Sequence, residues 1–103
     1  HGEKRQLEIG MALAAEPRLV LLDEPAAGLA RAERQRLTDL LLGIDRAVTL
    51  VIIEHDMEVA LRVAERVTIM DQGRILTEGT PDQIRADQRV HDIYLGRGYG
   101  TGP

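Results

Sequence analysis

The sequence predicts an α/β fold built around a parallel sheet. One short apolar run, Leu19 to Leu22, ends in Asp23-Glu24-Pro25, and a second run, Thr49 to Ile53, ends in Glu54-His55-Asp56. Both runs are too short for helices, and proline cannot continue a strand, so each is expected to be a strand buried on both faces. A helical pattern between them completes a β-α-β unit whose strands bring acids and an imidazole to one rim of the sheet.

Helical periodicity accompanies these strands. A helix is expected over residues 3–15, where Pro17 stops it, and a second over about residues 30–44. The apolar positions that share one face are Leu7, Met11 and Ala14 in the first helix and Leu37, Leu40, Leu41 and Ile44 in the second, where they are expected to face the sheet.

The second half of the chain predicts a hairpin followed by short helices. Gly73 can adopt a positive φ in a hairpin turn, and Thr80 begins a capping box with Pro81 at the first helical position. The expected elements are a helix capped by Asp56, a strand over 66–70, a turn over 71–73, a strand over 74–78, a helix from Pro81, a further helix around 90–95 and a frayed end over 96–103.

The composition narrows the functional class. The chain has 103 residues, of which 44% are hydrophobic, but it lacks Phe and Trp, so aliphatic side chains must form its core. A net charge of −4 and the lack of a basic block disfavour nucleic-acid binding. The sequence has no cysteine for disulfides or thiolate metal sites and no apolar run long enough to span a membrane, so membrane association is expected to need a partner.

Asp23 and Glu24 are the first candidates for chemistry. Ligands of open α/β sheets bind at the carboxyl ends of the strands, which is where these two acids stand. A buried acid needs a cation, a donor or a proton, and the chemistry that fits is a hard cation on one carboxylate and a polarised water on the other. The alternative is a polar turn that caps the next helix.

Four stretches in this order resemble the C-terminal part of an ATP-binding-cassette transporter ATPase. Leu19 to Glu24 is similar to the Walker B strand, Ala26-Ala27-Gly28-Leu29 to the D-loop, and His55 to the switch histidine of the H-loop. His1-Gly2-Glu3, followed by Lys4-Arg5-Gln6-Leu7, is similar to the tail of the signature motif and its helix. The resemblance covers nearly all of the chain and implies the C-terminal part of a P-loop NTPase domain.

Further stretches look most like the ATPases of branched-chain amino-acid importers. These are Glu54-His55-Asp56-Met57, Glu78-Gly79-Thr80-Pro81 and Tyr94-Leu95-Gly96. Urea importers and lipopolysaccharide exporters of the same branch are close relatives, so the transported substrate stays open.

The resemblance implies ATP hydrolysis with Mg²⁺. Asp23 is expected to hold Mg²⁺ through an ordered water, and Glu24 to position and deprotonate the water that attacks the γ-phosphate. His55 is expected to hydrogen-bond that phosphate and help orient the water. Without the neighbouring motifs, a lone histidine at the end of a strand is more often structural.

The resemblance also implies contacts across a dimer. His1, Gly2 and Glu3, as the signature tail, are expected to meet the ATP bound by the opposite subunit, while Gly28 and Leu29 belong to the D-loop. Ala30 departs from the family, which usually has Asp or Asn at this position. Alanine can neither cap the next helix nor bond across the interface.

Other family motifs are absent from these 103 residues. The sequence has no Gly-x-x-x-x-Gly-Lys-Ser/Thr loop, no Gln loop and no Leu-Ser ahead of His1, and it begins without Met inside a motif. Residues 1–103 are therefore expected to be one partial nucleotide-binding domain, inactive alone. In the intact protein, the resemblance implies a second ATPase subunit and transmembrane permease subunits, with the ATPase on the cytoplasmic face of the cell membrane.

Two alternatives come from other functional classes. A cassette ATPase acting on DNA is disfavoured by the negative charge and by the stretch from Glu54 to Met57. A non-catalytic module is the other alternative, in which the edge beside Leu19 to Leu22 lacks a neighbouring strand and pairs with a second copy of the chain.

Overall fold

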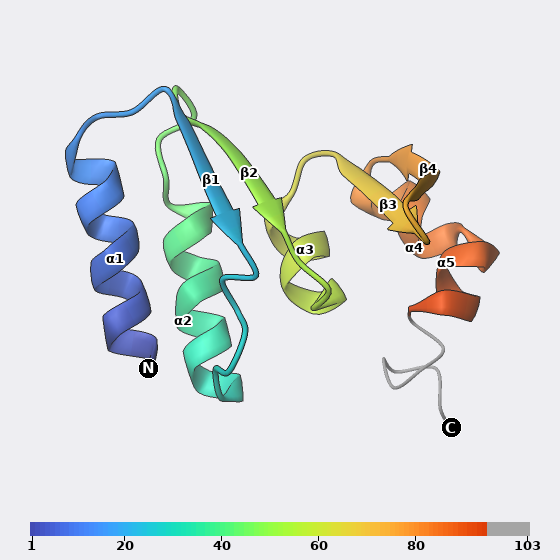
Figure 1. Cartoon of the computed structure of the whole chain (residues 1–103), viewed down its shortest axis with the longest axis horizontal. Helices are drawn as coiled ribbons and strands as arrows, with labels where there is room; N and C mark the ends of the chain where they lie inside the picture. Colours follow the sequence, from blue (N-terminus) through green and yellow to red (C-terminus); the bar gives the residue numbers. More distant parts are fainter. Residues whose placement is uncertain (95–103) are drawn as a thin grey trace.

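A computed structural model of the chain describes residues 1–94. Helices and strands alternate through the first two thirds of this part, and a hairpin and two short helices follow (Figure 1). The elements are α1 (Gly2–Ala14), β1 (Leu19–Asp23), α2 (Arg31–Leu42), β2 (Thr49–Ile53), α3 (Met57–Val63), β3 (Val67–Asp71), β4 (Arg74–Gly79), α4 (Pro81–Ala86) and α5 (Gln88–Ile93).

The β1-α2-β2 unit confirms the expected parallel sheet. The two strands pair in parallel from Leu19 opposite Thr49 to Asp23 opposite Ile53. The chain crosses between them through α2, which lies beside α1 (Figure 1). Because parallel strands run in the same direction, the residues that follow β1 and β2 meet at one end of the sheet.

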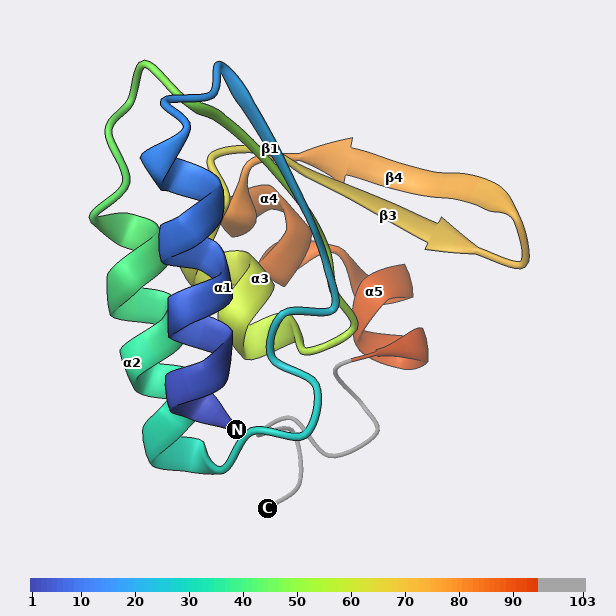
Figure 2. The ribbon, with the colours of Figure 1, turned by 60° about the vertical axis from the view of Figure 1, so that its left-hand side comes forward.

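The predicted hairpin is also present. Strands β3 and β4 pair antiparallel, from Val67 opposite Gly79 to Asp71 opposite Arg74, and project away from α1 and α2 (Figure 2). The two turn residues, Gln72 and Gly73, have φ values of 51° and 78°. Two positive φ values are typical of the tight turns whose twist matches that of the flanking strands.

Two hydrophobic clusters hold the chain together, and α3 contributes to both. Its Val59 packs with residues of α1 and α2, while its Met57 and Leu61 pack with the hairpin and the last helices. Burial of each such side chain contributes about 1.5–3 kcal/mol. The first cluster consists of Ile9, Ala26, Leu29, Leu37, Leu41 and Val59, and the second of Met57, Leu61, Val67, Ile69, Ile84 and Val90.

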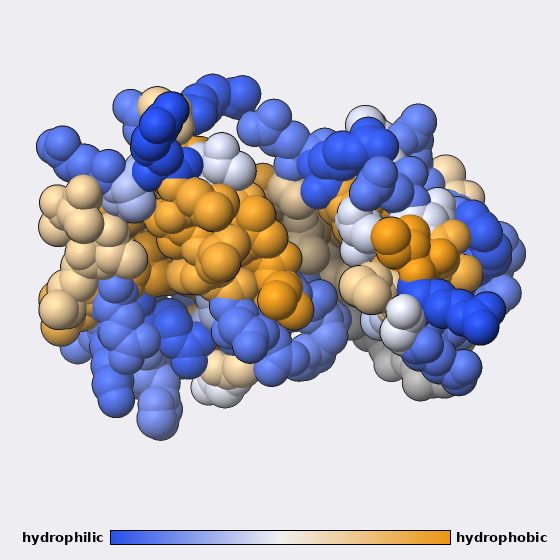
Figure 3. All heavy atoms as spheres, turned by 45° about the horizontal axis from the view of Figure 1, so that its top comes forward, coloured by the Kyte–Doolittle hydropathy of each residue, from blue (hydrophilic) through white to orange (hydrophobic). Residues whose placement is uncertain are grey.

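The sheet differs from the expectation in one respect, because β1 and β2 are covered on one face only. Val20 is 6% exposed, but Leu21 and Ile53, which lie on the other face, are 69% and 63% exposed. The continuous apolar runs predicted cover on both faces, yet all helices in residues 1–94 that pack on this sheet do so from the Val20 side. Hydrophobic side chains consequently gather on the surface of this half of the molecule (Figure 3).

Helix α1 also packs through an unexpected face. Leu7 and Met11 are 64% and 66% exposed, whereas Ile9 is 2% exposed and belongs to the first cluster. Gly2 is buried as well, because the start of α1 packs against Glu33 of α2. The i, i+4 spacing of Leu7 and Met11 correctly indicated a helix but not the face that packs against α2.

The remaining expectations are mostly confirmed. In α2, Leu37 and Leu41 are buried, and Leu40 and Ile44 pack against them. The Thr80 side chain and Gln83 form the capping box, with Pro81 at the start of α4. The predicted helix end at Leu95 and the frayed segment 96–103 lie outside the described residues. Within residues 1–94, no helix is both long and apolar enough to cross a bilayer.

An ion pair at the start of α5 makes part of the stability pH-dependent. Asp87 caps α5, and the Arg89 guanidinium donates to both of its carboxylate oxygens, at 3.2 and 2.9 Å. These bonds lower the pKa of Asp87 from its ordinary value of 3.8 to about 2. The stabilisation is therefore complete above pH 3.8 and is lost as the pH falls through about 2.

We expect Asp87→Asn to lower the thermal unfolding midpoint at pH 7 and to flatten its dependence on pH between about pH 5 and pH 2. Asp39→Asn is the matched control, because Asp39 is exposed and its carboxylate makes no hydrogen bond or ion pair within residues 1–94. Thermal unfolding followed by circular dichroism across this pH range gives both curves. Parallel curves for the native chain and the Asp87 variant would contradict the assignment.

Candidate functional site

The carboxyl ends of β1 and β2 bring Glu24 and His55 into contact. The Glu24 N–H donates to the carbonyl of Ile53 at 2.7 Å, which extends the pairing of the strands by one residue. Beyond this bond, Oε1 of Glu24 lies 2.7 Å from Nδ1 of His55. The two side chains are 48% and 69% exposed, so a ligand could reach them from solvent.

The backbone at Glu24 is unusual. Its φ of 48° lies in the left-handed region, which is uncommon for residues other than glycine. Holding a residue there costs on the order of 1–3 kcal/mol, and such positions are frequent at functional sites. β1 ends at Asp23, directly before this turn, and the Glu24 carboxylate contacts the imidazole that follows β2.

The Glu24–His55 contact fixes how the imidazole can act. An ionised carboxylate accepts a hydrogen bond, so Nδ1 of His55 carries the proton in this pair. The other ring nitrogen, Nε2, is then the atom through which His55 could meet a ligand. The pair therefore combines a carboxylate that can accept a proton with a ring held in one orientation.

Glu54 supports this pair from both sides, a role that the sequence alone did not predict. Its Oε2 accepts the N–H of Ala26 at 3.0 Å, in the loop that follows Glu24. Its Oε1 accepts the N–H groups of His55 and Asp56, each at 3.2 Å. One carboxylate thus holds the loops after both strands. In the sequence, only the position of Glu54 next to His55 pointed to this role.

Asp23 is the last residue of β1 and is exposed beside Glu24. Within residues 1–94, no three His, Asp or Glu side chains converge to form a protein cage for a metal ion. Mg²⁺ is commonly held by one or two carboxylates together with nucleotide phosphates and water, so a single exposed acid is compatible with that ion. Asp23 is the residue that would hold it.

The predicted signature tail lies at the start of α1. His1 and Glu3 are exposed, whereas Gly2 is buried and its N–H donates to Oε2 of Glu33 in α2 at 2.7 Å. A Cβ added at Gly2 would lie 2.5 Å from that oxygen, so any other residue here would have to displace the Glu33 carboxylate. The structure thus brings Gly2 to Glu33, while Glu24 pairs with His55.

The two predicted D-loop residues have different roles in the fold. Gly28 is exposed and has a φ of 77°, a conformation that favours glycine. The Leu29 side chain is 6% exposed and packs in the first cluster, so it anchors the loop. Gly28 is therefore the one of the two that is exposed at the surface.

Glu33 contributes a different cap to the start of α2, at the N–H of Ala30 itself. Its Oε1 accepts the N–H of Ala30, the N-cap residue of α2, at 3.0 Å. Hydrogen bonds from the N–H groups of Ala30 and Gly2 lower the pKa of Glu33 below its ordinary value of 4.5. The carboxylate therefore stays ionised at neutral pH and holds the starts of two helices.

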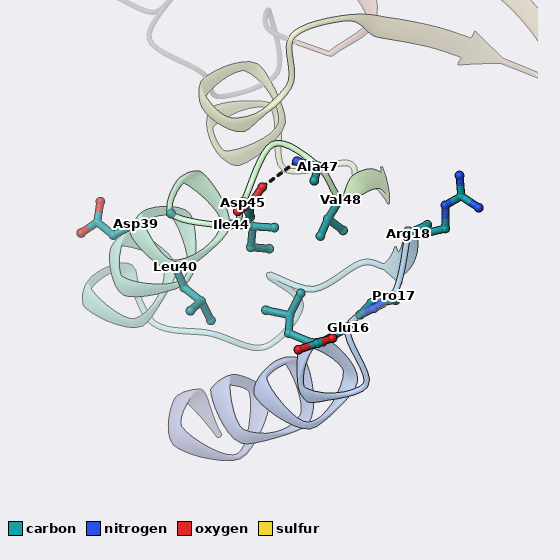
Figure 4. A pocket seen from close by; sticks show the side chains of 11 residues that line it. Glu16, Pro17, Arg18, Asp39, Leu40, Ile44, Asp45, Ala47 and Val48 are labelled. Atoms are coloured by element: carbon teal, nitrogen blue, oxygen red, sulfur yellow. Dashed lines mark hydrogen bonds between the residues drawn. The ribbon is translucent and has the colours of Figure 1, made fainter.

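A cavity of about 740 Å³ lies at the other end of the sheet, before β1 and β2 begin (Figure 4). Leu40, Ile44 and Val48 form part of its apolar wall, and the Arg18 guanidinium points away from it. Because Glu24 and His55 follow the opposite ends of these strands, the cavity is separate from their site.

Comparisons with known proteins point to one family. A family model described as a branched-chain amino acid ATP-binding cassette transporter matches residues 74–100. Over 98 residues, the chain is 40% identical to BraF of Pseudomonas aeruginosa and 38% identical to LivG of Escherichia coli K12, both named high-affinity branched-chain amino acid transport ATP-binding proteins. These alignments cover 93% of the chain and 38% of each relative.

A relative with another named role is similarly close. The lipopolysaccharide export system ATP-binding protein LptB of Haemophilus influenzae is 38% identical over 96 residues, covering 92% of the chain and 40% of LptB.

Solved structures share the fold. MJ1267, an ATP-binding cassette of an ABC transporter, matches in its ADP conformation with a TM-score of 0.78 and 30% identity. That match covers 92% of the chain and 39% of MJ1267. The protein cbiO1 of Clostridium perfringens, part of the ABC transporter complex cbiONQ, matches with a TM-score of 0.76 and 28% identity, covering 93% and 39%.

The chain spans about two fifths of the length of the relatives that it matches. Both the sequence matches and the structural matches to these relatives cover more than nine tenths of the chain. Over more than nine tenths of its length, the chain is therefore similar to part of the ATPases of ATP-binding-cassette transporters.

Proposed function

We propose that Asp23, Glu24 and His55 form the hydrolytic part of an ATP site in a transporter ATPase subunit. The observation that carries this proposal is the 2.7 Å contact between Glu24 and His55 beyond the ends of two parallel strands. Asp23 stands directly before Glu24 in the same strand end. An acid, a second acid and an imidazole at one rim match what phosphoryl transfer to water requires.

In this proposal each side chain has one task. Glu24 accepts the proton of the attacking water, and its turned backbone directs the carboxylate toward His55. His55, protonated on both ring nitrogens, keeps its Nδ1–H on Glu24, donates a hydrogen bond from Nε2 to the terminal phosphate and keeps the water in line. Asp23 holds Mg²⁺, which supplies charge neutralisation on the phosphates when it is bound.

We further propose that residues 1–103 act only as part of a larger nucleotide-binding domain. The sequence carries no Gly-x-x-x-x-Gly-Lys-Ser/Thr loop, so no residue of this chain is assigned to the α- and β-phosphates. ATP hydrolysis by this chain alone is therefore not expected. In the assembled protein, a second ATPase subunit would present its own signature tail to the site, and His1, Gly2 and Glu3 would do the same for the partner.

The transport role follows from the relatives. We propose uptake of branched-chain amino acids, with transmembrane permease subunits as partners and the ATPase at the cytoplasmic face of the membrane. The names of BraF and LivG and the family model over residues 74–100 support this choice. Lipopolysaccharide export is the second candidate, because LptB of Haemophilus influenzae is 38% identical over nearly the same part of the chain.

A non-catalytic role in self-association is favoured by a specific observation. Leu21 and Ile53 are largely exposed on one face of the sheet, and within residues 1–94 the outer edge of β1 has no strand beside it. Exposed edges and apolar faces promote pairing between chains. A second copy of this chain is the proposed occupant.

For the Glu24 role, we expect Glu24→Gln in the full-length ATPase to reduce kcat by at least about 10²-fold, because glutamine cannot accept the proton of the attacking water. Binding of ATP should persist. Glu65→Gln, at a side chain that is 85% exposed, serves as the control and should leave turnover unchanged. Turnover by Glu24→Gln at the native rate would remove Glu24 from the role of base.

For the His55 role, we expect His55→Ala to reduce kcat by roughly 10²-fold while KM for ATP changes little, because the imidazole acts mainly on the transition state. Steady-state phosphate release over a range of ATP concentrations separates the two constants. Equal losses of kcat and of affinity would instead assign His55 to binding.

For self-association, we expect the 103-residue chain to elute as a dimer or a larger species in size-exclusion chromatography with light scattering. Leu21→Lys, which places a charge on the exposed sheet face, should shift it to monomer. A native chain that stays soluble and monomeric would argue against this second role.

A further inference from the structure

The start of α1 and the loop over residues 25–30 are joined by two side chains. Glu33 accepts hydrogen bonds from Gly2 in α1 and Ala30 at the end of the loop. Arg5, one turn into α1, donates from Nη1 to the carbonyl of Pro25 and from Nη2 to that of Ala27, the latter at 3.3 Å. Figure 2 shows this end of α1 beside the loop that leads into α2.

Glu33 is suited to hold both segments. Its two oxygens each accept one backbone N–H, from Gly2 at 2.7 Å and from Ala30 at 3.0 Å. A glutamine at this position has one acceptor oxygen and could keep only one of these bonds. The bond to Gly2 is close, since a Cβ there would lie 2.5 Å from the Glu33 carboxylate and would have to displace it.

Arg5 makes the matching contact from the other side. A guanidinium has several donors in a rigid plane and can serve two carbonyls at once, which a lysine ammonium does less well. Beneath these polar contacts, Ile9 of α1 packs with Ala26 and Leu29 of the loop. Hydrogen bonds and packing therefore join the same two segments at three places.

We propose that Arg5 and Glu33 are positioning residues that make the loop over residues 25–30 and the first turns of α1 move as one unit. The inference rests on the proposed function, in which the exposed residues at the start of α1, His1 and Glu3, and the exposed Gly28 of the loop lie toward the opposite subunit. With the two segments joined, these residues reach that subunit in one fixed relative position. Loss of the Arg5 contacts or of the Glu33 contacts would let the start of α1 and the loop over residues 25–30 move independently.

The test uses the full-length ATPase with the variants Glu33→Gln, Arg5→Lys and the double variant. We expect each single variant to reduce kcat by about 10-fold to 10²-fold with KM for ATP little changed, because misplaced groups cost turnover. The double variant should lose less than the product of the two single losses, since both contacts serve one junction. Glu8→Gln and Arg62→Lys, at exposed positions, are the matched controls.

Amide hydrogen exchange of the same proteins provides a readout that does not depend on hydrolysis. Exchange at Gly2 and over residues 26–30 should speed up in Glu33→Gln and in Arg5→Lys, and stay unchanged in the controls. Faster exchange in proteins that show no ATPase activity would overturn the proposed function but keep the junction. Native kcat and native exchange in both single variants, or a gain of activity in Glu33→Gln, would overturn the inference.

Discussion

The parallel pairing of β1 with β2 is the constraint on which the rest of the site depends. Its register sets Asp23 opposite Ile53, and the next backbone bond joins Glu24 to Ile53. Because both strands end at the same level, the side chains of Glu24 and His55 meet without a long loop. A shift of the register would separate these two groups, whatever their sequence neighbours.

Backbone amides and carboxylates then stabilise the loops beyond the strands. Glu54 binds the N–H groups of Ala26, His55 and Asp56, and Glu33 binds those of Gly2 and Ala30. Each acid satisfies donors that a loop or a helix start leaves unpaired by secondary structure. The carboxylates of Glu54 and Glu33 thus form hydrogen bonds to nearby backbone N–H groups, and these bonds fix the conformation of the loops that carry Glu24, Gly28 and His55.

Sequence reasoning succeeded where the signal is local. The strand ends at Asp23 and Ile53, the turn at Gly73 and the capping box at Thr80 follow from residue types a few positions apart. It failed where the partner is distant: the apolar face with Leu7 and Met11 is exposed, and one face of β1 and β2 is open. The bond between Gly2 and Glu33 joins residues 31 positions apart and leaves no local pattern.

The proposed function requires Glu24 and His55 to act together at the terminal phosphate of a nucleotide. A crystal structure of the full-length protein with Mg²⁺ and a non-hydrolysable ATP analogue tests this directly. The terminal phosphate is expected to lie between these two side chains, with Asp23 beside the metal ion. A terminal phosphate bound away from both side chains would contradict it.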